Sequence, residues 1–237
     1  MLLPRRLAPG EAVTTVEPEG FNAALRDPAV RAIAVRGGHR MVDDLDVGAA
    51  RADPKPVLGT GGTTFVHLVF WQAAGLVGIH GDEADLTDDR PVRVRAEPDG
   101  PVRVGGRAAG PLLGGSLGAL RALVGTGLLP GLDGAILLLT GERTQGLGQV
   151  DRQLTHLIRA GVLGRVRGVA VGRFAGFGKL VDRDWTVGDV LADRLGGLGV
   201  PVLSGLPVGP GGAAVPIGVP AELDADAGEL VVAAGVR

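Results

Sequence analysis

Three glycine-rich loops carry the residues of this chain whose types and spacing could do chemistry. They follow three short apolar segments and cover residues 36–39 (Arg-Gly-Gly-His), 59–63 (Gly-Thr-Gly-Gly-Thr) and 80–83 (His-Gly-Asp-Glu). The carboxyl ends of parallel strands meet at one edge of a sheet, so we expect these loops to form one rim. Backbone N–H groups in such turns can approach an anion or a developing oxyanion closely. The predicted ligand-binding residues are Gly37, Gly38, Gly61, Gly62 and Thr63. The alternative is that these glycines only make tight turns in a chain that contains 42 of them.

Five side chains near this rim are candidates for acid–base catalysis. They are His39, Thr60, His80, Glu83 and Glu142. An imidazole titrates near neutral pH, so His39 could serve as an acid or a base, although a solvated loop histidine is the simpler interpretation. His80 opens an acidic stretch that continues through Asp82 and Asp85. A metal site would need convergent ligands, so we interpret the stretch as a solvated loop and predict no metal.

Conventional nucleophiles are scarce in this sequence. Ser116 and Ser204 are the only serines, and both fit a turn or a cap better than a catalytic position. The chain has no cysteine, which excludes disulfides, thiolate metal sites and a cysteine nucleophile. Threonines near the rim are therefore the only hydroxyls left for such a role.

The elements that must position these loops follow an α/β pattern. Apolar segments at 32–35, 56–58 and 76–79 predict buried parallel strands, and the patterns at 21–26 and 64–74 predict helices. Strands that alternate with helices indicate a parallel sheet with right-handed crossovers. Later segments predict helices at 112–129, 150–163 and 187–195, and strands at 135–139, 168–171, 200–203, 214–219 and 229–232.

We expect two domains joined by a polar stretch. Residues 1–88 form the predicted N-terminal α/β domain and residues 111–237 a C-terminal β/α domain. The linker at 89–110 is rich in proline and contains short Val-Arg-Val alternations, which suggest a small hairpin.

Composition and charge limit the kinds of molecule that this protein is expected to bind. The net charge is −2, so the sequence has no basic footprint for nucleic acid or an anionic membrane. No apolar run is long enough to span a bilayer, and the first residues do not resemble a secretion signal. We therefore expect a cytoplasmic protein with a small-molecule or peptide-like ligand and without a cofactor.

Several short motifs follow one another along nearly the whole chain. They include residues 7–11 (Leu-Ala-Pro-Gly-Glu), 36–38 (Arg-Gly-Gly), 80–81 (His-Gly), 114–117 (Gly-Gly-Ser-Leu), 150–154 (Val-Asp-Arg-Gln-Leu), 172–174 (Gly-Arg-Phe) and 216–218 (Pro-Ile-Gly). Their order resembles the LD-carboxypeptidase family of serine peptidases, which trims peptidoglycan tetrapeptides and includes microcin-immunity peptidases. The resemblance implies a flavodoxin-like N-terminal domain, a C-terminal β/α domain, a site between them and a homodimer.

The resemblance also implies a Ser-Glu-His triad, and this sequence departs from it at each position. The three positions are occupied by Gly61, Thr140 and Pro210, so the acid is either missing or displaced to Glu142. Glycine cannot form an acyl-enzyme, and proline offers neither a base nor a donor. Losing one triad member already costs several orders of magnitude in rate. The resemblance further implies that about one βα unit is deleted after residue 20, which should expose a sheet edge or reshape the pocket.

Two classes of function remain open from the sequence. One is a protein that has kept an amino-acid- or peptide-sized cleft without the serine mechanism, either for binding or for a different acid–base reaction. The other is an active hydrolase or amidase with a relocated site, in which Thr60 or Thr63 works with His39 or His80. A third interpretation is an interaction protein with a vestigial cleft.

Overall fold

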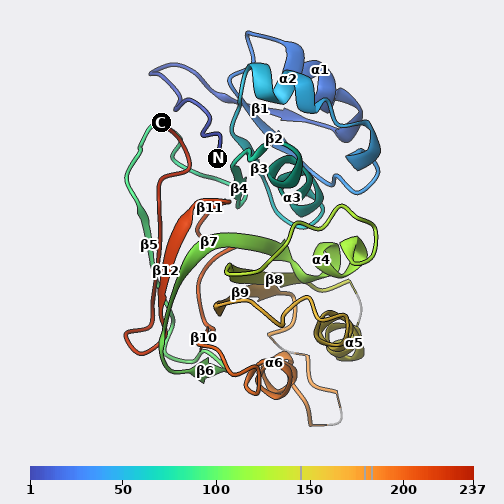
Figure 1. Cartoon of the computed structure of the whole chain (residues 1–237), viewed down its shortest axis with the longest axis vertical. Helices are drawn as coiled ribbons and strands as arrows, with labels where there is room; N and C mark the ends of the chain where they lie inside the picture. Colours follow the sequence, from blue (N-terminus) through green and yellow to red (C-terminus); the bar gives the residue numbers. More distant parts are fainter. Residues whose placement is uncertain (145, 179, 183) are drawn as a thin grey trace.

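The computed structural model of the chain describes residues 1–144, 146–178, 180–182 and 184–237. Within these ranges the strands form two sheets, of five and eight strands. The first sheet and helices α1 to α3 lie in the upper half of Figure 1, and the second sheet and helices α4 to α6 lie in the lower half. This arrangement agrees with the predicted α/β class, a parallel N-terminal sheet followed by a second β/α unit.

The first sheet has the strand order β1-β2-β3-β4-β11, in which the first four strands are parallel and β11 is antiparallel to β4. Its strands are β1 (Val13–Val16), β2 (Ala32–Val35), β3 (Val57–Gly59), β4 (Gly78–His80) and β11 (Val215–Ile217). Its helices are α1 (Phe21–Arg26), α2 (Val47–Ala52) and α3 (Thr63–Ala74), with 3-10 turns at Pro18–Gly20 and Val42–Asp44. Adjacent residues on a strand face opposite sides. Accordingly, Ile33 packs with Phe21 and Phe70 of the helices, whereas Ala32 packs with the N- and C-terminal segments.

The second sheet has the order β5-β13-β12-β7-β8-β9-β10-β6. Its strands are β5 (Val92–Arg95), β6 (Arg103–Val104), β7 (Arg107–Ser116), β8 (Ile136–Glu142), β9 (Gly168–Ala175), β10 (Val202–Leu203), β12 (Pro220–Asp224) and β13 (Glu229–Val232). Its helices are α4 (Leu117–Leu123), α5 (Leu147–Arg159) and α6 (Val187–Leu195). Strands β7 to β10 are parallel and lie at the centre of the sheet. Residues 136–141 of β8 are all buried, which explains the apolar run with which this strand begins.

The two sheets share one structural junction. Strand β11 comes from late in the chain, yet it pairs with β4 of the first sheet. Helix α3 faces both units, because Val66 packs in the core of the first sheet and Leu68 packs with the core of the second. The chain ends also meet, since the N–H of Arg237 donates to the carbonyl of Pro4 (3.0 Å). The termini accordingly lie close together at the upper left of Figure 1.

Two predictions about the middle of the chain were wrong. The helix expected at 112–129 is strand up to Ser116, and α4 occupies only Leu117–Leu123. The leucines of this segment are buried because β7 runs between β12 and β8, so tertiary pairing overrides the helical pattern. The hairpin expected in the linker does not form either. Strands β5 and β6 pair with β13 and β10, which come from the far end of the chain.

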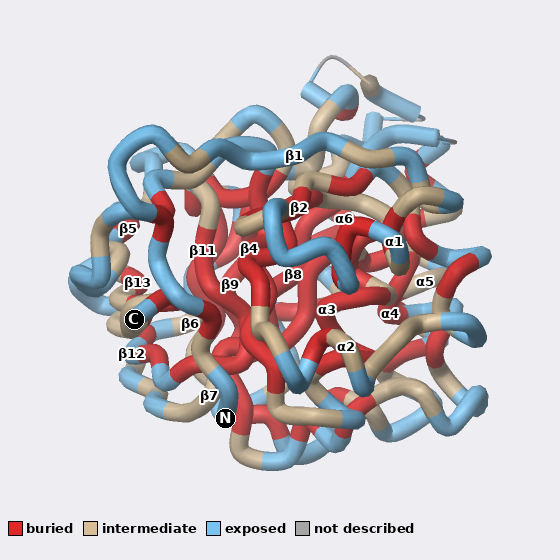
Figure 2. The backbone as a smooth tube through the Cα atoms, turned by 90° about the horizontal axis from the view of Figure 1, so that it is seen from above, coloured by how far each residue is buried: buried red, intermediate tan, exposed pale blue. Residues whose placement is uncertain are grey.

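Strand β1 is an open edge of the first sheet. Its four residues are Val-Thr-Thr-Val, and the first three are exposed. In Figure 2 the strand runs along the outside of the molecule, away from the buried centre that holds β4, β8 and β9. The sequence predicted either an exposed edge in this sheet or a reshaped pocket. Strand β1 is such an exposed edge. In the described ranges, no helix is both long enough and apolar enough to cross a membrane.

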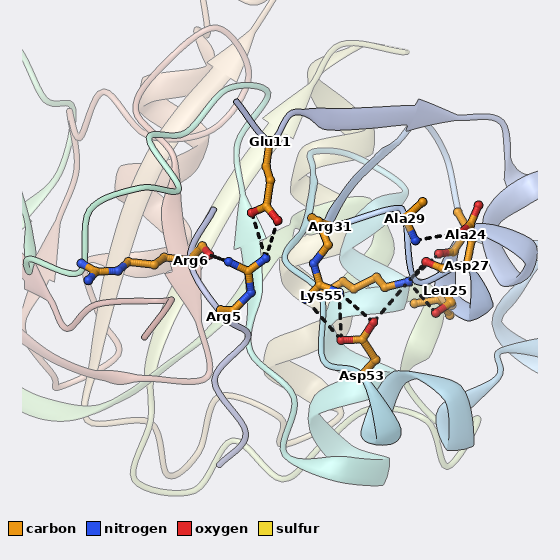
Figure 3. A network of polar contacts seen from close by, with 10 residues as sticks. All are labelled: Arg5, Arg6, Glu11, Ala24, Leu25, Asp27, Ala29, Arg31, Asp53 and Lys55. Carbon is orange, nitrogen blue, oxygen red and sulfur yellow. Dashed lines mark hydrogen bonds and ion pairs between the residues drawn. The ribbon is translucent and has the colours of Figure 1, made fainter. Parts of the chain in front are cut away.

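Lys55 holds the end of α1 in place. Its buried ammonium group donates to the carbonyls of Ala24 (2.9 Å), Leu25 (2.8 Å) and Asp27 (2.5 Å), as Figure 3 shows. These carbonyls belong to the last turn of a helix, where backbone acceptors have no partner within the helix. Asp53 lies 3.6 Å from the ammonium and supplies a countercharge. Burial lowers the pKa of Lys55, and the nearby Asp53 carboxylate opposes that shift.

Candidate functional site

The loop between β3 and α3 brings two of the predicted glycine turns together. Gly61 has a φ of +53°, a conformation that L-residues adopt only with strain. A β-carbon on Gly38 would lie 2.7 Å from the carbonyl oxygen of Gly62, so the loops after β2 and β3 are in direct contact. This close approach requires a glycine at residue 38, where the two loops touch.

Thr63 ties the same two loops with its side chain. Its hydroxyl donates to the carbonyl of Val35 (2.7 Å) and lies 3.3 Å from that of Gly37. The residue is completely buried. A hydroxyl that is buried and already bonded to backbone acceptors cannot reach a substrate, so Thr63 shapes the site and does not provide a nucleophile.

Glu142 faces Gly61 across the junction between the two units. It is the last residue of β8, just beyond an irregularity in the pairing with β9 between Leu139 and Gly141. Its Oε2 atom lies 3.5 Å from the position that a β-carbon on Gly61 would occupy. The side chain is exposed and has no hydrogen-bond or ion-pair partner within the described ranges. The carboxylate is therefore available to a ligand beside the glycine turn.

Two cavities meet at Glu142, Gly61 and Gly62. One, of about 460 Å³, lies at the carboxyl ends of β1 to β4, and its polar lining includes Thr15, Arg36, Thr60 and Asp82. The other, of about 210 Å³, extends toward α4 and α5. It is lined by Phe65, Ser116, Leu117, Gly118, Ala119, Gly141, Thr144, Gly146, Gln149, Val150, Gln153, Phe174 and Phe177 in addition to the shared residues. Binding pockets for small molecules have this size and combine apolar walls with a few polar groups.

Asp82 joins loops from both units at the edge of the larger cavity. Its Oδ1 accepts a hydrogen bond from the hydroxyl of Thr60 (3.0 Å). Its Oδ2 accepts one from the N–H of Gly211 (3.1 Å), which follows Pro210. Asp82 thus connects the glycine turn to the loop that carries Pro210, and the hydroxyl of Thr60 is engaged by this bond.

His80 lies inside the junction and away from either cavity. Its Nε2 shares a hydrogen bond of 3.0 Å with the hydroxyl of Thr140, and the ring is fully buried. Burial lowers the pKa of His80 to about 3, and the neighbouring ring of His67 contributes to the shift. The ring is therefore neutral at physiological pH. The bond crosses from β4 to β8, so this pair connects the two sheets.

The remaining predicted residues lie at separate places. His39 is exposed, with its ring centroid 6.4 Å from that of Phe65, whereas Glu83 lines a different hollow together with Arg90. Asp85, from the same acidic stretch, accepts hydrogen bonds from the N–H and the hydroxyl of Thr87. These bonds lower the pKa of Asp85. In the ranges that the structure describes, no three His, Cys, Asp or Glu side chains converge as a metal site would require.

Sequence reasoning did not single out several residues that line the cavities. Arg36 was noted only as part of its loop, and Asp82 only as part of an acidic stretch. Gln149 and Gln153 lie one helical turn apart on α5 and face the smaller cavity together. That spacing, on the polar side of an amphipathic helix, was the available signal for the two glutamines.

The cavities hold groups that can bind a ligand. They contain the carboxylate of Glu142, an arginine, two amide side chains and an aromatic wall. Gly61 has no side chain, and Pro210 lies in the loop bonded to Asp82. The buried His80 bonds a threonine, and its low pKa makes it a weak base.

Comparison with known sequences relates this chain to carboxypeptidases along most of its length. The sequence model of the LD-carboxypeptidase N-terminal domain matches residues 17–81, and that of the C-terminal domain matches residues 109–223. A candidate carboxypeptidase of Streptomyces coelicolor is 40% identical over 238 aligned residues, covering 90% of this chain and 74% of that protein. One from Synechocystis is 35% identical over 230, covering 86% of this chain and 73% of that protein.

Solved structures agree in fold. An MccF-like protein from Bacillus anthracis has a TM-score of 0.83 at 18% identity, covering 99% of this chain and all of that one. The microcin C7 self-immunity protein MccF, solved with glutamyl sulfamoyl guanosine, has a TM-score of 0.80 at 17% identity, with complete coverage of both chains. A muramoyltetrapeptide carboxypeptidase from Oxalobacter formigenes has a TM-score of 0.76 at 22% identity, covering 93% of this chain and 83% of that one. These TM-scores establish a common fold.

Proposed function

Since the chain belongs to the LD-carboxypeptidase family, we propose that it binds an amino-acid- or peptide-like small molecule without the serine mechanism of that family. The observation that carries the proposal is the pair formed by Gly61 and Glu142. Residue 61 offers no side chain, and the Glu142 carboxylate, which has no partner among the described residues, stands 3.5 Å from where a β-carbon would be. The MccF relative solved with a sulfamoyl nucleoside carrying a glutamyl group supports a small-molecule ligand.

The proposal describes a pseudoenzyme with respect to peptide hydrolysis. Acyl transfer needs an activated nucleophile together with a base that can take its proton. Thr63 is bonded to backbone carbonyls and Thr60 to Asp82, while His80 is enclosed beside Thr140. These contacts also argue against a relocated site built from Thr60 or Thr63 with His80.

Two measurements on the purified chain test the proposal. The first is calorimetric binding of free amino acids and short peptides, for which we expect saturable binding of at least one ligand. The second is labelling with a fluorophosphonate probe together with release of the terminal amino acid from a peptidoglycan tetrapeptide. We expect neither labelling nor release. Labelling of Thr60 or Thr63, or turnover of the tetrapeptide, would show instead that the chain is an active hydrolase.

We also propose that the protein is a cytoplasmic homodimer. The open edge of β1 supports the dimer, because an uncharged, exposed edge strand is a ready template for pairing with another chain. The cysteine-free sequence is compatible with a reducing compartment. Cell fractionation tests the location, and the mass in solution tests the dimer.

A further inference from the structure

Two opposite charges line the larger cavity without a protein partner. The guanidinium of Arg36 and the carboxylate of Glu142 are both exposed, and neither has a hydrogen bond or ion pair within the described ranges. The other carboxylate of this cavity, Asp82, is already bonded to Thr60 and to the N–H of Gly211. The cavity thus offers one cation and one anion to a ligand, at different positions on its wall.

The smaller cavity has a different chemistry. Phe65, Phe174 and Phe177 line it, and the last two rings pack with centroids 6.4 Å apart. Gln149 and Gln153 add amide groups on the α5 side. An apolar or aromatic side chain fits such a wall, because burial of its surface is favourable and aromatic contacts add to it.

Glu142 and Gly61 lie where the two cavities join. A tetrahedral carbon at this boundary can direct one substituent into each cavity while a third contacts Glu142. Gly61 contributes by lacking a side chain, since a β-carbon there would stand 3.5 Å from the Glu142 carboxylate and take up space beside it. The α-carbon of an amino acid has substituents that fit: a carboxylate, an ammonium and a side chain.

We propose that this junction binds a free, zwitterionic amino acid that has a large apolar side chain. Glu142 binds the ammonium group, Arg36 binds the carboxylate, and the side chain enters the cavity lined by Phe65, Phe174 and Phe177. The inference rests on the proposed function and specifies its ligand and orientation. Charge-assisted hydrogen bonds of this kind are the strong ones in partly buried sites.

The test pairs altered ligands with matching variants. Wild-type protein is titrated calorimetrically with phenylalanine, glycine, N-acetylphenylalanine and phenylalaninamide. The last two lack the ammonium and the carboxylate charge, respectively, so each should bind about tenfold or more weakly than phenylalanine. Glycine should also bind more weakly, because it leaves the aromatic cavity empty.

Substitutions at Glu142 and Arg36 test which residue binds the ammonium and which binds the carboxylate of the ligand. Glu142→Gln should weaken phenylalanine about tenfold and change the affinity for N-acetylphenylalanine by less than about twofold. Arg36→Gln should weaken phenylalanine similarly but leave phenylalaninamide unaffected. Glu222→Gln and Arg143→Gln make the same chemical changes at exposed residues that line neither of the two cavities, and both should bind like wild type.

The outcomes separate this inference from the proposed function. If phenylalanine binds but Glu142→Gln and Arg36→Gln weaken all ligands equally or not at all, the orientation is wrong and the binding function stands. If no amino acid or peptide binds in any form, the proposed function itself fails. If Glu142→Gln weakens phenylalanine but not N-acetylphenylalanine, and Arg36→Gln weakens phenylalanine but not phenylalaninamide, the orientation and the binding function are both supported.

Discussion

The Oε2 atom of Glu142 lies 3.5 Å from the point at which a β-carbon on Gly61 would sit. A carboxylate and a turn without a side chain therefore face each other at the junction of the two units. The separation is an ordinary van der Waals contact, so a small side chain at residue 61 fits without a steric clash. This geometry makes the effect of a serine at residue 61 directly testable.

We predict that Gly61→Ser folds but gains no peptidase activity. The positive φ of Gly61 costs a residue with a β-carbon about 1 kcal/mol, which a domain of ordinary stability tolerates. The new hydroxyl would have no histidine beside it, because His80 is buried against Thr140. Circular dichroism checks the fold, and a tetrapeptide assay checks the activity. Release of the terminal amino acid by the variant would mean that a functional base survives in the site.

The buried histidines predict a loss of stability in mild acid. Burial lowers the pKa of His67 to about 4 and that of His80 to about 3, from an ordinary value of 6.5. Both rings stay neutral in the folded protein at pH 5, whereas the unfolded chain binds a proton on each. The free energy of unfolding should therefore fall as the pH drops below 6.5, by about 2 kcal/mol per histidine at pH 5. Urea unfolding at pH 7 and pH 5 measures the change.

Substitutions of single histidines test whether they cause the loss of stability between pH 7 and pH 5. His80→Asn should remove about half of the difference between the two pH values, because one of the two buried rings is gone. The exposed His156 is the matched control, and His156→Asn should leave the difference unchanged. An identical pH dependence in all three proteins would contradict the assignment.

Lys55 is predicted to stabilise the N-terminal unit through its backbone contacts. Lys55→Met keeps the apolar stem but leaves the carbonyls of Ala24, Leu25 and Asp27 without their donor. We expect a loss of about 2–3 kcal/mol in the free energy of unfolding. The control is Arg107→Met, which removes an exposed ion pair to Asp224 and should cost less than about 1 kcal/mol. Equal losses in chemical denaturation would show that the carbonyl contacts contribute little.

The homodimer can be tested at the edge strand. Thr14→Lys places a charge at an exposed position of β1, and in an antiparallel pair of β1 strands the two lysines would lie near each other. We expect dissociation to a monomer of unchanged stability, measured by light scattering after gel filtration. Ala227→Lys, in an exposed turn, should remain a dimer. A wild-type monomer, or a Thr14→Lys dimer, would rule out pairing along β1.

Much of the fold could be predicted because local sequence and tertiary structure agree in the first unit. The helix Phe21–Arg26 and the strand Ala32–Val35 were predicted with their observed bounds. The segment 112–116 could not be assigned locally, because its leucines are equally compatible with a helix until β12 and β8 enclose it. The partners of β5 and β6 come from more than 90 residues away, which no local pattern encodes.

Local sequence also predicts only part of the site. The glycine turns were predicted because strands that end in glycine converge at one edge of a sheet. The proximity of Glu142 to Gly61 depends on how β8 lies against the first unit, and no sequence spacing reveals that. His80 illustrates the converse, since its position at the end of a strand suggested a rim residue. Its pairing with Thr140 places it inside the junction instead.

The pairing of β11 with β4 has a consequence for biosynthesis. Residues of β4 leave the ribosome more than 130 residues before Val215–Ile217, so the first sheet cannot be completed until nearly the whole chain has been made. Until then the nascent chain carries a sheet with β1 open on one side and β4 open on the other. A product that ends prematurely near residue 88 would keep both edges exposed to other chains. The strand that joins the two units therefore also sets the moment at which the β4 edge is closed.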